Sequence, residues 1–159
     1  MSLAAAVITV SDRSARGERA DTSGPLAVAA LRAAGFECAD AVIIPDGAVS
    51  VEAALRETLQ RGIRLVITTG GTGISPRDRT PEGTAPVLDR ELPGIAEELR
   101  RRATAQKPGG MLSRGLSGIA GRALIVNLPG STAAVADGVR LVLEVAQHAL
   151  GQLEGEDHR

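Results

Sequence analysis

The segment that most constrains the fold runs from residue 65 to residue 82. An apolar run at residues 65–67 leads directly into Thr-Thr-Gly-Gly-Thr-Gly at residues 68–73. After a polar turn, Thr-Pro-Glu at residues 80–82 offers a capping residue, a proline suited to the first helical position, and an acid for the positive end of the helix dipole. The segment therefore predicts a strand, a glycine loop and a helix in succession.

The glycine loop also suggests chemistry. Glycines alone often only turn the chain, but without Cβ atoms they let backbone N–H groups approach an anion closely. The same loop carries Arg77 and Asp78, whose guanidinium and carboxylate suit a phosphate and a divalent cation. The glycine spacing matches neither a Walker A loop nor a dinucleotide fingerprint. An anion site is therefore favoured over a kinase or dehydrogenase.

The rest of the chain alternates between strand and helix patterns. Four apolar runs are typical of buried strands: residues 4–10, 36–44, 64–68 and 123–128. Helical patterns cover residues 25–34, 51–61, 81–92, 95–103 and 135–150, with Pro86 expected to break or kink the third. Residues 107–110 read as a loop, and residues 111–118 have no clear pattern. This alternation predicts a parallel, doubly wound α/β sheet.

Length and composition narrow the class of protein. A chain of 159 residues suits one domain, which we expect over residues 1–150, followed by a flexible tail at residues 151–159. The net charge of −1 gives no general attraction to polyanions, and aromatic residues are only 1% of the chain. Nucleic acid is therefore not an expected partner.

The remaining composition points to a cytoplasmic location. The single cysteine, Cys38, cannot form an internal disulfide and lies in a strand-like run, so we interpret it as a core residue. The first apolar run is too short for a signal sequence, and no run reaches membrane-spanning length. We expect a cytoplasmic protein with no membrane partner.

Polar or glycine-bearing segments follow four of the predicted strands, and the carboxyl ends of parallel strands share one edge of a sheet. These segments are Ser11-Asp12-Arg13, Asp46-Gly47, residues 70–78 and residues 127–131. Each also has a plainer interpretation: Asp12 and Asp46 suit turns, and Ser131 suits a helix cap. Together they predict a site for a phosphorylated ligand with a divalent cation, whereas the reaction does not follow from their spacing.

From about Val7 to Leu150 the chain resembles the molybdopterin-binding proteins of molybdenum cofactor biosynthesis of the MogA/MoaB type. The resemblance rests on residues 10–13 with Gly17, Asp21 and Ser23-Gly24 downstream, Pro45-Asp46, residues 68–73, Arg77-Asp78 with residues 80–82, Ser113-Arg114 and residues 127–131. It implies the molybdopterin-binding fold, a three-layer α/β/α sandwich with a mostly parallel, Rossmann-like sheet.

The resemblance also implies an activity, the Mg²⁺-dependent transfer of an adenylyl group from ATP to molybdopterin with release of pyrophosphate. Asp46 and Asp78 match the family's catalytic and metal-binding aspartates. The substrate-binding positions would be Ser11, Asp12, Gly70, Gly71, Thr72, Gly73, Ser113, Arg114, Pro129, Gly130 and Ser131. A homotrimer or hexamer is expected, as is hand-over of the product to a molybdate-inserting enzyme.

Two other readings remain open at this point. One is a MoaB-like oligomer that binds molybdopterin without transferring an adenylyl group, although two metal-ready carboxylates, Asp46 and Asp78, favour the enzyme. The other is a relative of the pterin-binding domain of the molybdate-inserting enzymes, which we expect within a longer chain. Lys107 is the only lysine, so basic contacts in that half of the site must come from it or from Arg114.

Overall fold

The computed structural model describes residues 3–155. Its strands are β1 (Ala4–Val10), β2 (Glu37–Cys38), β3 (Val42–Ile44), β4 (Leu65–Thr69), β5 (Arg90–Glu91), β6 (Ser117–Ala120) and β7 (Ala123–Leu128). Its α-helices are α1 (Asp12–Ala15), α2 (Ser23–Ala33), α3 (Ala48–Gln60), α4 (Thr80–Thr84), α5 (Pro93–Gln106) and α6 (Thr132–Leu153). Two 3₁₀ helices, η1 (Ala85–Val87) and η2 (Pro108–Leu112), complete the described elements.

The strands form one sheet in the order β2-β1-β4-β7-β6-β5, with β3 also pairing with β1. Strands β1, β2, β3, β4 and β7 run parallel, and β6 and β5 add an antiparallel edge. Ile67 in β4 lies opposite Val7 in β1 and Val126 in β7. The predicted mostly parallel sheet is therefore confirmed.

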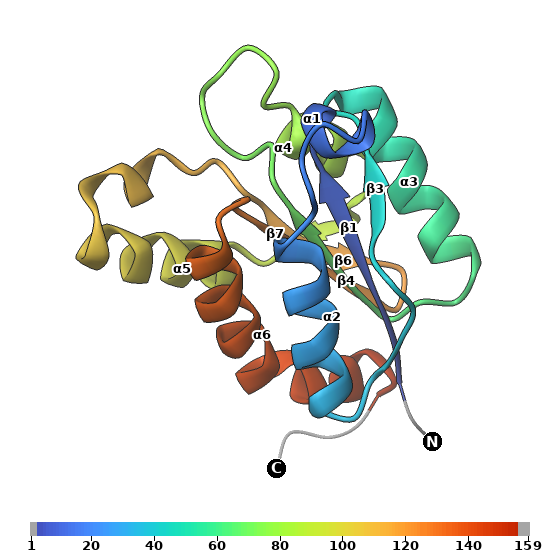
Figure 1. Cartoon of the computed structure of the whole chain (residues 1–159). Helices are drawn as coiled ribbons and strands as arrows, with labels where there is room; N and C mark the ends of the chain where they lie inside the picture. The colour runs from blue at the N-terminus through green and yellow to red at the C-terminus, as the bar shows by residue number, and fades with distance from the viewer. Residues whose placement is uncertain (1–2, 156–159) are drawn as a thin grey trace.

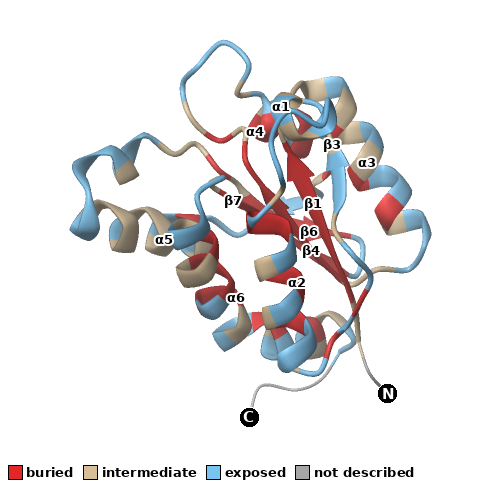
Figure 2. Ribbon diagram, in the orientation of Figure 1, coloured by how far each residue is buried: buried red, intermediate tan, exposed pale blue. Residues whose placement is uncertain are grey.

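Helices cover both faces of the sheet, so the molecule has three layers (Figure 1). Side chains alternate along each central strand: Leu65 and Ile67 pack in a cluster with residues of α2 and α6, whereas Val66 packs with residues of α3. All three are fully buried, and the strands form the buried centre of the molecule (Figure 2). The predicted α/β/α sandwich is confirmed.

The strand predicted at residues 36–44 is instead two short strands. β2 pairs with the start of β1 and β3 with its end, and the chain leaves the sheet between them. The Nε of Arg32 donates a hydrogen bond of 2.8 Å to the carbonyl of Cys38, which takes that carbonyl out of the ladder. The apolar pattern of residues 36–44 gave no sign of this side-chain donor, which lies six residues before Cys38.

The helix predicted at residues 81–92 is wrong beyond Thr84. Pro86 brings no N–H, so α4 gives way to the 3₁₀ turn η1, and the chain then pairs with β6 as β5. Thr80 does not cap this helix either. It is the first helical residue, and its hydroxyl donates a 2.8 Å hydrogen bond to the carbonyl of Gly70.

Two further boundaries differ from the predictions. α5 continues to Gln106 and is followed by η2 and β6, where we predicted a loop and no clear structure. α6 reaches Leu153, and Glu154 accepts a hydrogen bond from Arg64, so the start of the predicted tail is ordered. Residues 156–159 of that tail lie outside the described residues. Among the described helices, none combines the length and hydropathy needed to cross a membrane.

Candidate functional site

The glycine loop after β4 is held at the carboxyl edge of the sheet by backbone contacts. The N–H of Gly70 donates to the carbonyl of Leu128 at 2.9 Å, and the N–H of Thr80 donates to the carbonyl of Gly71 at 3.0 Å. Gly71 has a φ of +67°, and a Cβ there would collide with the Thr80 hydroxyl. Only glycine fits at this position.

A buried polar network supports the loop from below. Asn127 is 2% exposed, and its amide donates to the hydroxyls of Thr68 at 2.9 Å and Thr84 at 3.0 Å. Its carbonyl oxygen accepts from the N–H of Leu116 at 3.0 Å. Because the four residues come from β7, β4, α4 and the approach to β6, one side chain ties together the elements that carry the site.

Arg114 braces the loop from its outer side. Its guanidinium donates to the carbonyls of Gly73 and Asp78, both at 2.8 Å, and to a carboxylate oxygen of Glu82 at 2.6 Å. The hydrogen bond from Arg114 is the main reason that the pKa of Glu82 lies below its ordinary value. These contacts make Arg114 a residue that positions the loop, and the prediction that it also binds substrate stays a prediction.

Asp46 and Asp12 hold each other across the loop ends of β3 and β1. The N–H of Asp12 donates to Asp46 Oδ2 at 2.9 Å, and the N–H of Asp46 donates to Asp12 Oδ1 at 3.0 Å. Asp12 Oδ2 also pairs with Arg77 at 3.1 Å, so both of its oxygens are occupied. The Oδ1 of Asp46 is directed toward the glycine loop. It lies 3.4 Å from the point that a Cβ would occupy if Gly71 carried a side chain.

Asp78 approaches the same loop from its other end. Its Oδ2 accepts a 3.0 Å hydrogen bond from the N–H of Ser75. The same oxygen lies 2.8 Å from the point that a Cβ would occupy if Gly73 carried a side chain. The structure therefore brings Asp46 and Asp78 to two sides of one glycine loop. Within residues 3–155, no three His, Cys, Asp or Glu side chains converge as a metal cage.

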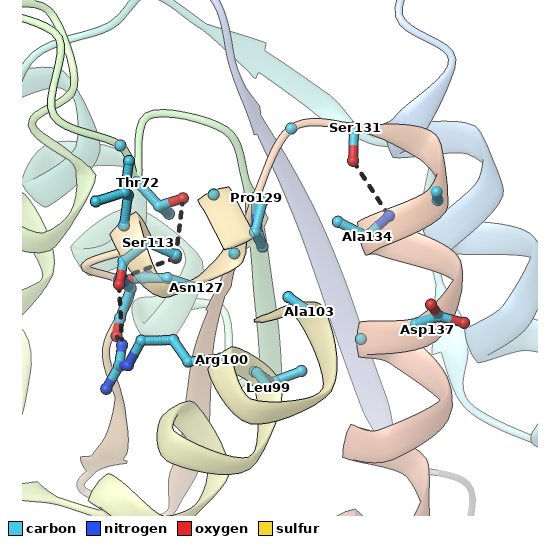
Figure 3. Close-up of a pocket in the computed structure, with 18 of the residues that line it drawn as sticks. Thr72, Leu99, Arg100, Ala103, Ser113, Asn127, Pro129, Ser131, Ala134 and Asp137 are labelled. Carbon is cyan, nitrogen blue, oxygen red and sulfur yellow. Dashed lines mark hydrogen bonds between the residues drawn. The ribbon is translucent and has the colours of Figure 1, made fainter. Parts of the chain in front are cut away.

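A cavity of about 460 Å³ opens beside the loop, between α5 and α6 (Figure 3). Its rim includes many of the predicted site residues: Gly70, Gly71, Thr72, Gly73, Asp78, Ser113, Pro129, Gly130 and Ser131. Its walls come from helical residues that the sequence did not single out as site residues: Ala96, Leu99, Ala103, Gln106, Ala133, Ala134, Asp137 and Gly138. No local motif marks those residues, because only the tertiary fold places α5 against α6.

A second cavity of about 310 Å³ adjoins the first. The two share Gly70, Gly130 and Ser131, and the second is lined largely by hydroxyl side chains that include the predicted Ser11. The hydroxyl of Ser23 donates to the carbonyl of Gly130 at 2.7 Å, which joins the start of α2 to the start of α6. Asp12, Asp46 and Arg114 line neither of these cavities.

Several groups at or next to the junction of the two cavities are available to an anion. The backbone N–H groups of Gly71, Thr72 and Gly73 donate to no acceptor within the described residues. Ser131 caps α6 by accepting from the N–H of Ala134 at 3.2 Å, which leaves its hydroxyl proton free. A run of free N–H groups beside a helix N-terminus is a common arrangement for holding phosphate.

Comparison with known proteins shows a consistent set of relatives. The chain is 41% identical over 149 residues to the molybdopterin adenylyltransferase of Pyrococcus furiosus, covering 91% of this chain and 87% of that protein. A solved structure of the molybdopterin biosynthesis enzyme MoaB from Thermus thermophilus is 41% identical, covers 99% of each chain and superposes with a TM-score of 0.88. Both cover most of the present sequence.

Other relatives are longer. The molybdenum cofactor biosynthesis bifunctional protein of Chlorobaculum tepidum is 35% identical over 153 residues, which cover 96% of this chain but 49% of the relative. The chain thus spans about half the length of such bifunctional relatives. The family model described as a probable molybdopterin binding domain matches residues 6–148. The chain therefore belongs to this family of molybdopterin-binding domains from molybdenum cofactor biosynthesis.

Proposed function

We propose that this protein transfers an adenylyl group from ATP to molybdopterin. The observation that carries the proposal is the pair of adjoining cavities that meet at Gly70, Gly130 and Ser131. An adenylylated pterin has a ring system at each end and phosphates in the middle, which matches a cavity on each side of an anion-holding junction. The name of the Pyrococcus furiosus relative supports the same activity.

In this reaction a phosphate oxygen of molybdopterin attacks the α-phosphorus of ATP. The bond from that phosphorus to the oxygen that bridges to the β-phosphate breaks, and pyrophosphate leaves. The free N–H groups of Gly71, Thr72 and Gly73, next to the junction, would hold phosphate oxygens, and Ser131 at the N-terminus of α6 lies at the junction itself. The protein's contribution is to align two bound substrates and to stabilise charge, as phosphoryl chemistry generally requires.

The carboxylates beside the loop fit a magnesium ion. Mg²⁺ commonly takes one or two protein carboxylates together with substrate phosphates and water. Asp46 and Asp78 each retain an oxygen without a hydrogen-bond partner among the described residues. These two residues would hold the ion, which when bound supplies positive charge to the triphosphate.

The test is release of pyrophosphate by the purified protein given ATP, Mg²⁺ and molybdopterin. Asp78→Asn keeps the shape of the side chain but removes its charge, and we expect turnover to fall on the order of 100-fold or more with little loss of stability. Asp40→Asn is the matched control, because Asp40 is exposed and its one ion pair within residues 3–155 is with Arg32 at 3.1 Å. Unchanged turnover in Asp78→Asn would contradict the assignment of Asp78 as a ligand of the magnesium ion.

A binding protein without transferase activity is the alternative, and the same cavities would serve it. Wild-type protein that binds molybdopterin tightly but makes no adenylylated product would establish this alternative.

We also propose that the chain forms a homo-oligomer, a trimer or hexamer, which sedimentation equilibrium tests directly. Hand-over of product to a molybdate-inserting enzyme would appear as transfer between the two purified proteins.

A further inference from the structure

The two carboxylates proposed to hold magnesium follow strands on opposite sides of β1. Strand β3, which leads to Asp46, pairs with β1 where Ile44 lies opposite Val10. Strand β4, which leads to the glycine loop and Asp78, pairs with β1 on its other side. The segment that follows β1 therefore lies between the two segments that carry the carboxylates. Asp12 belongs to this middle segment, at the start of the short helix α1 (Figure 1).

Asp12 holds Asp46 on one side. The two residues exchange hydrogen bonds, 2.9 Å from the Asp12 N–H and 3.0 Å from the Asp46 N–H, which fix both the backbone and the carboxylate of Asp46. No other donor within the described part of the chain contacts that carboxylate. The direction of its remaining oxygen, Oδ1, therefore depends on Asp12.

Arg77 joins Asp12 to the glycine loop on the other side. Its Nη1 donates a 3.1 Å hydrogen bond to Asp12 Oδ2. Residues 74–77 are exposed, and within the described chain this is the only side-chain hydrogen bond that they make to another segment. Arg114 holds the carbonyl of Asp78 from the outer side of the loop. On the side of β1, the position of Asp78 thus depends on the ion pair of its neighbour Arg77.

Asp12 is better suited to positioning than to binding the ion itself. Its Oδ1 accepts from the Asp46 N–H and its Oδ2 from Arg77, and a guanidinium at that oxygen repels a cation. Mg²⁺ demands nearly ideal octahedral geometry, so its binding depends on how its ligands are spaced. We propose that Asp12, together with Arg77, is a positioning residue that sets the spacing of Asp46 and Asp78 for the metal ion.

This inference rests on the proposed function for its metal ion, but its test needs no turnover. Mn²⁺ is the probe, because it takes the same oxygen ligands as Mg²⁺, and its binding is followed by water proton relaxation. The whole chain is titrated at fixed ionic strength, without ATP or molybdopterin. Asp12→Ala removes the side-chain links to both Asp46 and Arg77. We expect it to weaken Mn²⁺ binding on the order of 10-fold, the usual effect of losing a residue that orients a metal ligand.

Arg77→Ala separates positioning from simple electrostatics. If charge alone mattered, removing a positive charge beside a cation site would strengthen Mn²⁺ binding. Because Arg77→Ala also breaks the link to Asp12, we expect it to weaken binding several-fold instead. Arg79→Ala is the matched control, since Arg79 also flanks Asp78 but pairs with Glu82 at 3.7 Å. This control should bind Mn²⁺ at least as tightly as wild type.

A double variant tests whether the two residues act together. If Arg77 acts through Asp12, the variant with both residues changed to alanine should bind Mn²⁺ no more weakly than Asp12→Ala alone. The Arg77 side chain is 68% exposed, and surface ion pairs add little to global stability. Arg77→Ala therefore tests the proposal even if Asp12→Ala proves unstable.

Three results would overturn the inference. They are a wild-type chain that binds no Mn²⁺, an Arg77→Ala variant that binds it at least as tightly as wild type, and additive losses in the double variant. If wild type releases pyrophosphate while both single variants bind Mn²⁺ normally, the positioning role is refuted and the proposed transfer stands. If the variants lose Mn²⁺ as expected but wild type makes no adenylylated product, the transfer is refuted and the positioning role stands.

Discussion

At the scale of single residues, the brace between Arg114 and Glu82 helps to hold the glycine loop in place. The pair joins two segments 32 residues apart, and a Glu82 oxygen, Oε2, is buried without a hydrogen-bond partner. Arg114 was predicted to bind substrate because Ser113-Arg114 is one of the motifs shared with the molybdopterin-binding family. Its carbonyl partners, Gly73 and Asp78, became visible only in the fold.

The brace predicts a pH dependence of stability. Since Arg114 lowers the pKa of Glu82, the pair stabilises the fold fully above the ordinary pKa of 4.5 and loses this effect as the pH falls through the lowered value. Glu82→Gln removes the titrating group. We expect the variant to have a lower Tm than wild type at pH 7 and the difference to shrink below about pH 4.5, measured by thermal unfolding from pH 7 to pH 3. A difference that is constant across this range would contradict the brace.

At the scale of elements, sequence patterns succeeded where a segment is buried on both faces. The runs that became β1 and β7 were predicted with their observed bounds, because continuous apolar residues have no other low-energy place than the centre of the sheet. Residues 36–44 and 81–92 failed for the opposite reason. They lie at the sheet's margins, where Arg32 and Pro86 decide locally whether the backbone joins a ladder.

Asn127 offers a test of how these elements are held together. In Asn127→Ala, the Leu116 N–H and the hydroxyls of Thr68 and Thr84 lose their common partner. An unsatisfied buried group costs about 1–3 kcal/mol, so we expect a loss of roughly that size and a Tm lower by several degrees. Thr58→Val is the control, since among the described residues the Thr58 hydroxyl donates only to the carbonyl of Ala54 within α3. Similar losses in the two variants, measured by urea unfolding, would show that the network has no special role.

At the scale of the whole molecule, the sequence predicted one side of the site and missed the other. The glycine loop, Asp78 and residues 129–131 follow strands of a parallel sheet, so their meeting at one edge follows from topology. No comparable topological rule predicts that α5 forms a wall of the cavity. Leu99, Ala103 and Gln106 belong to an ordinary amphipathic helix, and only its packing against α6 makes them part of a cavity.

The side-by-side cavities predict the kinetic order of the proposed reaction. In the proposed reaction each cavity would receive one substrate and the phosphates would meet at Gly70 and Gly130, so both substrates must be bound before the adenylyl group moves. Double-reciprocal plots at several fixed concentrations of the second substrate should therefore intersect. Incubation with ATP labelled at the α-phosphate, without molybdopterin, should leave the protein unlabelled, since transfer is direct between the two ligands. Parallel plots together with a labelled protein would instead require a covalent adenylyl-enzyme, and the two cavities would then have to be filled in turn.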